Sequence, residues 1–481
     1  MITVRGRSRC SSQANAGQSP DSSPAGLPVA NAPYQVDLRQ RFWLITFATL
    51  FLSASPFFCF ASELMLRDGT LVTPTSLIER TPEGDFSFAS AERNYVLSAH
   101  EWITWGQWHE RYDLPQLILT DGSRLSVWVR GLTRNELSIE SDVWPLHQLT
   151  RDALRELCFQ PPVRLRERDR LLDLLTHDPT SRGDRLLLTQ GDRLFGRFQN
   201  TPLNQAGEPG STQQTEFEQV WFERAAGQPA RSIPVADVVA AWWQASPLAD
   251  GSLPEREVGD RIPREPSPTK RARLLVGLRD GSLLVVKRCE QIATQVRLVL
   301  ACGAELAADG SRFWPEVTFL QPLDESVRYL SDSEPLAYRQ VPFFALTRSL
   351  GRDRNAQGGR LRFAQRVYAK GIGLQGTARA VYELQAGDEQ FAAEVGIDAI
   401  SGEEGSVIFR VFVERQLDEG KRAWEMAFQT PIVRGGEPLL PIRLDLQQAQ
   451  RLALVTDFAD RTDLGDLANW FNARILRTAE R

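Results

Sequence analysis

The sequence predicts an all-β protein, in which a C-terminal jelly-roll β-sandwich is preceded by several small repeated β-barrel-like or β-sheet units. Three observations predict this class. Short segments of alternating apolar residues recur along the chain, turn residues separate them, and no long helical pattern interrupts them. Many short strands with turns between them are typical of small barrels and two-sheet sandwiches.

Four segments share a hairpin opening in which alternating apolar residues lead into a tight turn and a second strand. They are LMLRDGTLV at 64–72, LILTDGSRLSV at 117–127, LLLTQGDRLFG at 186–196 and VGLRDGSLLVV at 276–286. Three of them turn on Asp-Gly, a strong signal of a two-residue hairpin, because both turn positions then need positive φ. The repetition predicts SH3-like or Sm-like barrels, or one larger β-array.

These patterns divide the chain into successive parts. They are a disordered leader plus signal peptide or signal-anchor at 1–61, two β-repeat units at 62–157, a third unit at 158–245, a linker at 246–272, a fourth unit at 273–325 and the β-sandwich at 329–478.

The leader predicts export. Residues 5–33 are rich in Ser, Pro, Ala and Gly, and such segments bury too little to fold. Arg39 and Arg41 then precede an apolar run at 42–61 that ends at a plausible cleavage site after Ala61. The protein is therefore expected to be secreted, periplasmic or at the cell surface. The run is nearly long enough to span a bilayer, so a membrane becomes a partner only if this segment is retained.

The amino-acid composition restricts the kinds of partner and metal site that the protein is expected to have. The 481 residues are 42% hydrophobic and 24% charged, which suits several packed, soluble domains. The formal net charge of −5 argues against nucleic acid, because phosphate contacts need clustered Lys and Arg. No CxxC pair occurs, which excludes a thiolate zinc site. Cys289 and Cys302 are expected near each other across a hairpin centred near Ala293, either bridged or as buried thiols.

Catalytic signatures are missing from the sequence. The four histidines all lie upstream of the C-terminal third, which therefore holds no Ser-His-Asp or Cys-His arrangement. No GxSxG, HExxH or Walker motif occurs anywhere. The sequence predicts that the protein is not an enzyme, with an unrecognised hydrolase activity as the alternative. Among the tryptophans of the first two repeats, Trp105 and Trp108 are the rings most expected at the surface.

Three phrases in the C-terminal third carry the most information. They are YAKGIG at 368–373, FAAEVGID at 391–398 followed by GSVIFRVFV at 405–413, and GDLANWFNARI at 465–475. The two middle segments alternate apolar residues as half-buried strands do, and the polar DAISGEEGS between them predicts an antiparallel pair. A short last strand is expected at 473–476.

Together these phrases resemble the NPCBM/NEW2 domain, a carbohydrate-binding module first noted beside family 98 glycoside hydrolases. The resemblance covers about a third of the chain and implies a jelly roll of the galactose-binding-like type. Two positions depart from the family pattern: Gln375 stands where His is common, and Asn469 stands where an acid usually precedes Trp470. A departure at a ligand contact would change the sugar preference or abolish the site.

The resemblance implies that a carbohydrate binds at loop tips of the sandwich. Shallow sugar sites combine an aromatic ring with polar side chains that hydrogen-bond hydroxyl groups. The candidate ligand-binding residues are Gln375, Arg379, Trp424, Asp460, Asp463 and Trp470. Trp470 has core packing as its alternative role.

One acidic cluster is a candidate metal site. Asp457, Asp460 and Asp463 recur every third residue before the last strand, and calcium prefers oxygen ligands. The spacing is not that of a recognised calcium loop, so solvated turn acids are the alternative. No other cofactor is predicted.

The sequence therefore predicts an exported, non-catalytic carbohydrate-binding protein, without naming the sugar. Two alternatives stay open. One is a structural or protein-interaction scaffold of the cell envelope, and the other is an accessory subunit of a separate glycosidase.

Overall fold

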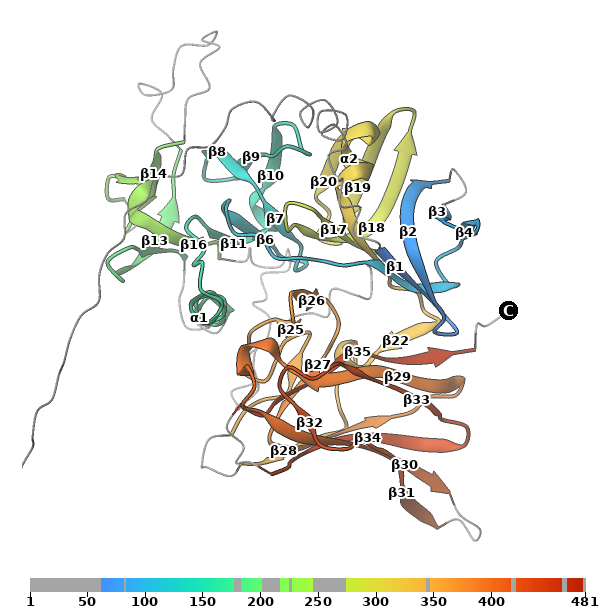
Figure 1. The fold of residues 1–481 in the computed structure, drawn as a ribbon. Coiled ribbons are helices and arrows are strands. Elements are labelled where there is room, and N and C mark those ends of the chain that lie inside the picture. The colour runs from blue at the N-terminus through green and yellow to red at the C-terminus, as the bar shows by residue number, and fades with distance from the viewer. Residues whose placement is uncertain are drawn as a thin grey trace, which may run out of the picture. The chain divides into compact units, whose positions relative to one another are not determined.

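The protein is described by a computed structural model. It covers residues 62–81, 84–176, 183–200, 217–224, 227–244, 274–342, 347–416, 421–460 and 465–478. The leader predicted at 1–61 and the linker predicted at 246–272 lie outside these residues. Ala61–Arg481 forms one compact unit that consists mostly of strands (Figure 1). In the described ranges, no helix is both long and apolar enough to cross a membrane.

The strands before the sandwich fall into four repeats. Repeat 1 contains β1 (Ser62–Leu66), β2 (Leu71–Arg80), β3 (Phe86–Ser90), β4 (Asn94–Leu97) and β5 (Trp102–Gly106). Repeat 2 contains β6 (Gln116–Leu119), β7 (Arg124–Ser126), β8 (Trp128–Leu132), β9 (Glu136–Glu140), β10 (His147–Thr150), η1 (Arg151–Ala153) and β11 (Leu154–Cys158). The helix α1 (Leu165–Thr176) follows repeat 2.

Repeats 3 and 4 each contain five strands and one short helix. Repeat 3 contains β12 (Asp184–Leu188), β13 (Arg193–Phe198), β14 (Gln219–Glu223), β15 (Arg231–Pro234), η3 (Val235–Asp237) and β16 (Val238–Trp242). Repeat 4 contains β17 (Leu274–Leu278), β18 (Leu283–Ile292), β19 (Gln295–Leu300), β20 (Glu305–Asp309), α2 (Gly310–Glu316) and β21 (Val317–Pro322).

Each repeat is a small curled sheet with one strand order. Its first strand pairs on one side with the second strand and on the other with the last, as β1 pairs with β2 and β5. The third strand then pairs with the second, and the fourth with the third. Repeats 2, 3 and 4 keep this pattern, with the second strand of repeat 2 divided into β7 and β8. The predicted all-β class with repeated barrel-like units is confirmed.

The repeated turns differ from the expected two-residue hairpin. Only the glycine of each turn has positive φ, as in Gly69 and Gly122, and the residue before it, Asp in three repeats and Gln190 in repeat 3, does not. The amide of Gly122 donates to the carbonyl of Leu119, and the Asp121 carboxylate accepts from the amide of Ser123. The side chain of Asp thus stabilises an ordinary turn ahead of a left-handed glycine, which accounts for Asp-Gly without positive φ at both positions.

Neighbouring repeats join through equivalent strands. The last strands of repeats 2 and 3 pair at Leu157 and Ala241, and those of repeats 1 and 4 pair at Trp105 and Leu320. Each of these residues also lies opposite the central buried residue of its own first strand. Both contacts are therefore local two-fold arrangements.

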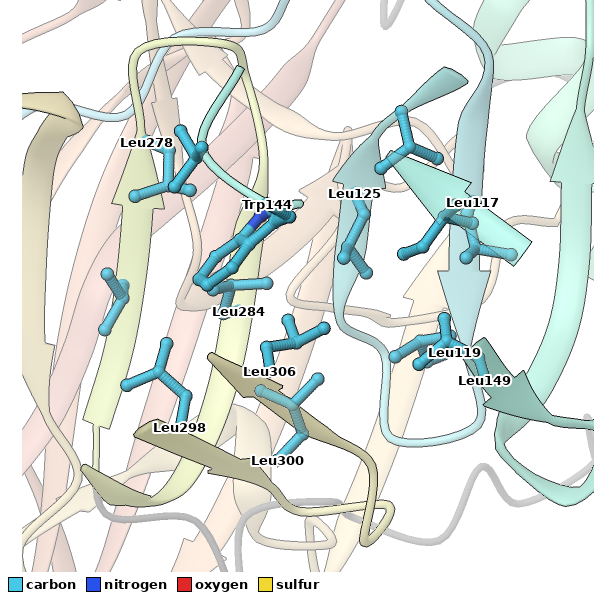
Figure 2. Close-up of a cluster of buried hydrophobic side chains, with 14 of the residues drawn as sticks. Leu117, Leu119, Leu125, Trp144, Leu149, Leu278, Leu284, Leu298, Leu300 and Leu306 are labelled. Carbon is cyan, nitrogen blue, oxygen red and sulfur yellow. The ribbon is translucent and has the colours of Figure 1, made fainter. Parts of the chain in front are cut away.

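A second kind of contact links repeats 2 and 4, whose β7 and β18 pair at Arg124 and Leu283. Figure 2 shows leucines of both repeats around Trp144, which packs against Phe313 with 5.6 Å between ring centroids. Nε2 of His147 accepts a hydrogen bond from the amide of Ala307. The repeats are thus connected in the order 3, 2, 4, 1 through one continuous hydrophobic core.

The sandwich has two sheets (Figure 1). Sheet I contains β24 (Gly351–Arg352), β27 (Gly371–Gln375), β35 (Leu467–Arg477), β29 (Asp388–Ile397) and β33 (Leu440–Asp445), with β22 (Val327–Tyr329) beside β35. Sheet II contains β23 (Ala337–Val341), β28 (Thr377–Glu383), β34 (Ala449–Phe458), β30 (Ser406–Gln416) and β31 (Arg422–Gln429), with β32 (Val433–Arg434) beside β30. The short elements are η5 (Leu330–Asp332), η6 (Ala399–Ser401) and the hairpin of β25 (Leu361–Phe363) and β26 (Arg366–Tyr368).

Two expectations about the sandwich strands are wrong. The segments FAAEVGID and GSVIFRVFV form β29 and β30, which lie in opposite sheets and do not pair with each other. Their connection passes from one sheet to the other at the end of the sandwich, and the apolar residues of both strands face the core between the sheets. The last strand is also longer than predicted, because residues of β35 are buried on both faces and show no alternation.

Within the described residues, Cys158, Cys289 and Cys302 are free thiols. Cys289 lies on β18 opposite Leu298, and Cys302 follows β19, so the two do not face each other across the hairpin that turns at Ala293. Burial raises the pKa of the Cys289 thiol to about 11. Of the two alternatives, the structure has the thiols and not the bridge.

Candidate functional site

The lysine of the YAKGIG phrase is buried and doubly paired. Lys370 is 3% exposed, and its Nζ lies 2.7 Å from Asp332 Oδ1 and 3.0 Å from Asp353 Oδ2. Burial alone would lower the pKa of Lys370, but the two carboxylates raise it above its usual value. A side chain on Gly371 would lie 2.6 Å from the carbonyl oxygen of Trp470. The phrase therefore packs β27 against β35 and does not itself form a ligand site.

Asn469, one of the two departures from the family pattern, is an internal hydrogen-bonding residue. Its Nδ2 donates to the fully buried Asp398 at 2.6 Å. The same carboxylate accepts from the amides of Ile400 and Arg362. Burial raises the pKa of Asp398, and these hydrogen bonds oppose that shift. Asn469 thus stabilises the connection after β29 and does not reach the surface.

The outer face of sheet I is covered by the repeats. Tyr329 and Leu476 of the sandwich pack with Ile103 of β5, and Trp108 forms a bridge with Val367 of β26. Trp108 is only 3% exposed, and its Nε1 donates to the carbonyl of Gly281. The expectation that Trp105 and Trp108 lie at the surface is wrong, because both rings are buried by residues distant in the sequence.

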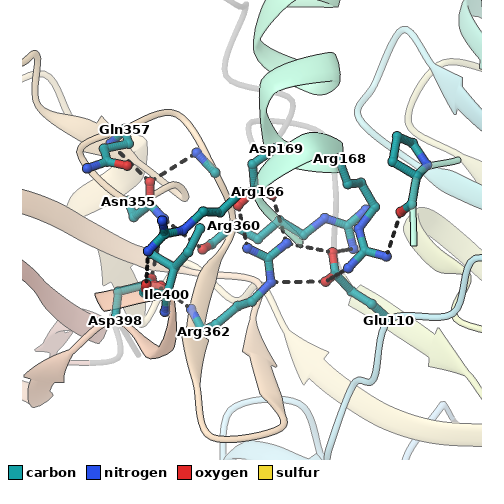
Figure 3. Close-up of polar contacts among 12 residues, drawn as sticks. Glu110, Arg166, Arg168, Asp169, Asn355, Gln357, Arg360, Arg362, Asp398 and Ile400 are labelled. Carbon is teal, nitrogen blue, oxygen red and sulfur yellow. Dashed lines mark hydrogen bonds and ion pairs between the residues drawn. The ribbon is translucent and has the colours of Figure 1, made fainter. Parts of the chain in front are cut away.

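A buried ionic network fixes this junction (Figure 3). Arg362, on the sandwich hairpin, binds Glu110 through Nε at 3.0 Å and Asp169 of α1 through Nη1 at 2.7 Å. Nη1 of Arg360 lies 2.6 Å from Glu110, and Arg168 contributes a third cation at 3.4 Å. Burial alone would raise the pKa of Glu110, but these arginines hold it at about 2. No local pattern predicts this network, because Glu110, Asp169 and Arg362 are distant along the chain.

Two predicted site residues lie at one end of the sandwich, here named the loop end, where β27 and β34 finish and β35 begins. Gln375 is the last residue of β27, and Asp460 follows β34. The side-chain oxygen of Gln375 is buried without a hydrogen-bond partner among the described residues. The carboxylate of Asp460 is exposed and lies 2.5 Å from Arg434. Asp463 is outside the described residues.

Other predicted residues lie elsewhere. Trp424 is on the edge strand β31, opposite Glu414 and towards the end of the sandwich away from the loop end. Its ring is 44% exposed and belongs to the outer face of sheet II. Arg379 is exposed on the same face, paired in register with Arg339 and Val455. The predicted residues therefore form two groups instead of one site.

Trp470 belongs to neither group. Its side chain is fully buried in the sandwich core and packs edge-on against Phe409 at 5.3 Å between ring centroids. This placement corresponds to the core role given as the alternative, and it leaves the ring out of reach of a ligand at the surface.

The acidic cluster does not form a metal site within the described residues. No group of three His, Cys, Asp or Glu side chains able to hold a metal ion occurs there. Asp457 pairs with Arg410 and Asp460 pairs with Arg434. Both carboxylates are thus neutralised by arginine where a calcium site would need them for the ion.

One exposed apolar residue beside Trp424 was not among the predicted site residues. Met426, two residues along β31, is 52% exposed and lies opposite Phe412 on the same face of sheet II. The spacing of two between Trp424 and Met426 is the signal that places them on one face of a strand.

Residues 326–476 match the family model of the NPCBM/NEW2 domain. The resemblance predicted from the three phrases is confirmed for this part of the chain. The four repeats end at Pro322, before the match begins.

Solved structures with a similar fold include carbohydrate-binding modules. One contains CBM51-2 in complex with GlcNAc and INT domains of Clostridium perfringens ZmpB (21% identity, 40% of this chain, 40% of that chain, TM-score 0.28). Another is CBM51 from Clostridium perfringens GH95 in complex with methyl-galactose (20% identity, 31% of this chain, 99% of that chain, TM-score 0.27). The match thus spans two fifths of the first protein's length. No curated protein matches the chain by sequence.

Proposed function

We propose that this protein is an exported, non-catalytic carbohydrate-binding protein whose C-terminal sandwich binds sugar. The match of residues 326–476 to the NPCBM/NEW2 domain carries the proposal. The absence of histidine from the sandwich sequence supports a binding role over acid–base or nucleophilic catalysis by imidazole. Export rests on the apolar run that follows Arg39 and Arg41.

The loop end is the proposed sugar site. The repeats cover the outer face of sheet I, so a ligand has access to the loop end and to the outer face of sheet II. At the loop end, the exposed pair of Arg434 and Asp460 offers a donor and an acceptor for adjacent hydroxyl groups. Gln375, the last residue of β27, lies at the same end of the sandwich, and its amide group is the further polar group proposed for this site.

A glycan array probed with the full chain, with and without calcium, tests the proposal. Gln375→Ala and Asp460→Asn are expected to abolish a reproducible signal, while Trp424→Ala on the other side of the sandwich retains it. Loss with Trp424→Ala alone would move the site to sheet II. A blank array with folded protein would refute sugar binding. Equal signals with and without calcium are expected, because Asp457 and Asp460 already pair with arginines.

A scaffold role is the second candidate function. The observation that favours it is the size of the repeat region. Its four repeats share one hydrophobic core, and buried ion pairs hold it against the sandwich. A blank glycan array together with a specific protein partner in cross-linking of intact cells would support this role over sugar binding.

A further inference from the structure

A small cavity lies beside the buried ionic network of the junction. Its volume is about 20 Å³. The charged groups in its lining are the carboxylate of Glu110 and the guanidinium groups of Arg111, Arg124, Arg168 and Arg360. Most of the other lining side chains are apolar. Positive charge is therefore in excess around this cavity.

The carboxylates of the network do not balance this charge (Figure 3). Glu110 is shared among three arginines, since it lies 2.6 Å from Arg360, 3.0 Å from Arg362 and 3.4 Å from Arg168. Asp169, the other acid of the network, accepts from both terminal nitrogens of Arg362. Two carboxylates thus serve three cations before any further arginine is considered.

Arg124, the first residue of β7, is that further cation. It is half-buried, and within the described residues its guanidinium group forms neither a hydrogen bond nor an ion pair. Burial lowers the pKa of Arg124, and the neighbouring charge of Arg360 lowers it further, whereas Glu110 opposes the shift. A cation that is removed from water without a counterion destabilises the folded state.

Two other arginines of the lining have donors without acceptors. The Nε atoms of Arg168 and Arg360 are buried, and neither has a hydrogen-bond partner among the described residues. Arg168 is only 5% exposed, and its guanidinium group lies over the ring of Tyr112, 3.9 Å from the ring centroid. Buried donors are rarely left unpaired in folded proteins. The unpaired donors and the excess charge both call for a negatively charged acceptor in the cavity.

We propose that this cavity binds a chloride ion between Arg124, Arg168 and Arg360. The ion supplies the missing negative charge and accepts hydrogen bonds from the guanidinium groups. The size of the cavity favours an anion of one atom, because a volume of about 10–15 Å³ already holds a water molecule and chloride is only slightly larger. Tetrahedral oxyanions such as phosphate and sulfate are too large for about 20 Å³.

The three arginines come from three parts of the fold. Arg124 belongs to repeat 2, Arg168 to α1, and Arg360 to the segment before β25 of the sandwich hairpin. A chloride ion between them therefore stabilises the attachment of the sandwich to the repeats. The site is separate from the loop end and does not depend on the proposed sugar binding.

Thermal melting of the full chain in sodium chloride and in sodium gluconate at equal ionic strength tests the proposal. Gluconate does not fit the cavity, so the wild type is expected to melt at least about 1 °C higher in chloride. Arg124→Gln should lose this difference. In gluconate it should melt no lower than the wild type, because the substitution removes a cation that has no counterion. A purely structural role of Arg124 would instead lower the melting temperature equally in both salts.

Arg130→Gln is the matched control. Arg130 is also a half-buried arginine of repeat 2, but it pairs with Glu140 at 2.7 Å, so the variant should keep the wild-type difference between the salts. The line width of the chloride NMR signal measures binding without unfolding the protein. The wild type and Arg130→Gln should broaden the signal more than Arg124→Gln does.

Equal melting of the wild type in the two salts would overturn the proposal. So would a chloride effect on melting, or a chloride line width, that Arg124→Gln leaves unchanged. Neither result bears on the glycan array, so failure of the chloride site and failure of sugar binding are distinguishable.

Discussion

The two sheets of the sandwich differ in what covers their outer faces. On sheet I, Tyr329 and Leu476 are buried against the repeats, and Arg362 is held by Glu110 and Asp169. On sheet II, Trp424 and Met426 are about half exposed, and nothing among the described residues buries them. One outer face of this module is therefore buried against the repeats, and the loop end and the outer face of sheet II are the surfaces that stay accessible.

Trp470→Ala is expected to cause the largest loss of stability, because its ring fills the core shared by both sheets. Truncation of a fully buried tryptophan costs up to about 5 kcal/mol in unfolding free energy. Chemical denaturation of the full chain measures it. A loss below about 1 kcal/mol would place this side chain outside a packed core.

Glu110→Gln is expected to lower the unfolding free energy by about 3 kcal/mol, because it leaves buried arginines without their common partner. The control is Glu425→Gln, since Glu425 pairs with Arg415 at the surface and such pairs contribute about 0–1 kcal/mol. Equal effects of the two substitutions would show that the junction is hydrated and that the outer face of sheet I is not buried.

The stabilisation by Glu110 should also depend on pH. Its pKa is about 2 in the folded protein and 4.5 as the ordinary value, so it binds a proton more readily when unfolded. The difference in unfolding free energy between the wild type and Glu110→Gln is therefore constant at neutral pH. It shrinks as pH falls from about 4.5 towards 2, with Arg168, Arg360, Arg362 and Asp169 as the charges that face the carboxyl. A difference that grows on acidification would contradict this assignment.

Trp424→Ala should have the smallest effect on stability, within about 0.5 kcal/mol, because its ring is exposed on an edge strand. Thermal melting of Trp424→Ala and Trp470→Ala under the same conditions compares an exposed and a buried tryptophan of one module. A large loss would mean that an unrecognised contact covers sheet II.

The sequence predicted what depends on local patterns. Asp-Gly turns and alternating strands located the four repeats, and the period of two in 405–413 correctly predicted that Val407 and Phe409 share the core face. The prediction failed where burial comes from distant residues. β35 is covered on both faces, so its sequence carries no alternation.

At the candidate site, too, the prediction failed where residues distant in the sequence bury a side chain. Asp460 and Gln375 were predicted among the ligand-binding residues, and both lie at one end of the sandwich, but the side-chain oxygen of Gln375 is buried. Trp108 was expected at the surface, but Val367 of the sandwich and Gly281 of repeat 4 bury it through contacts that no local pattern encodes.

Hydroxyl-radical labelling of the full chain, read by mass spectrometry, tests most directly whether the outer face of sheet I is buried and that of sheet II is exposed. Trp424 and Met426 of sheet II should be oxidised much faster than Tyr329 and Trp108 at the junction, because oxidation of side chains follows their exposure. Comparable labelling of Tyr329, Trp108 and Trp424 would contradict the closed junction and would return sheet I to the surfaces available for a ligand.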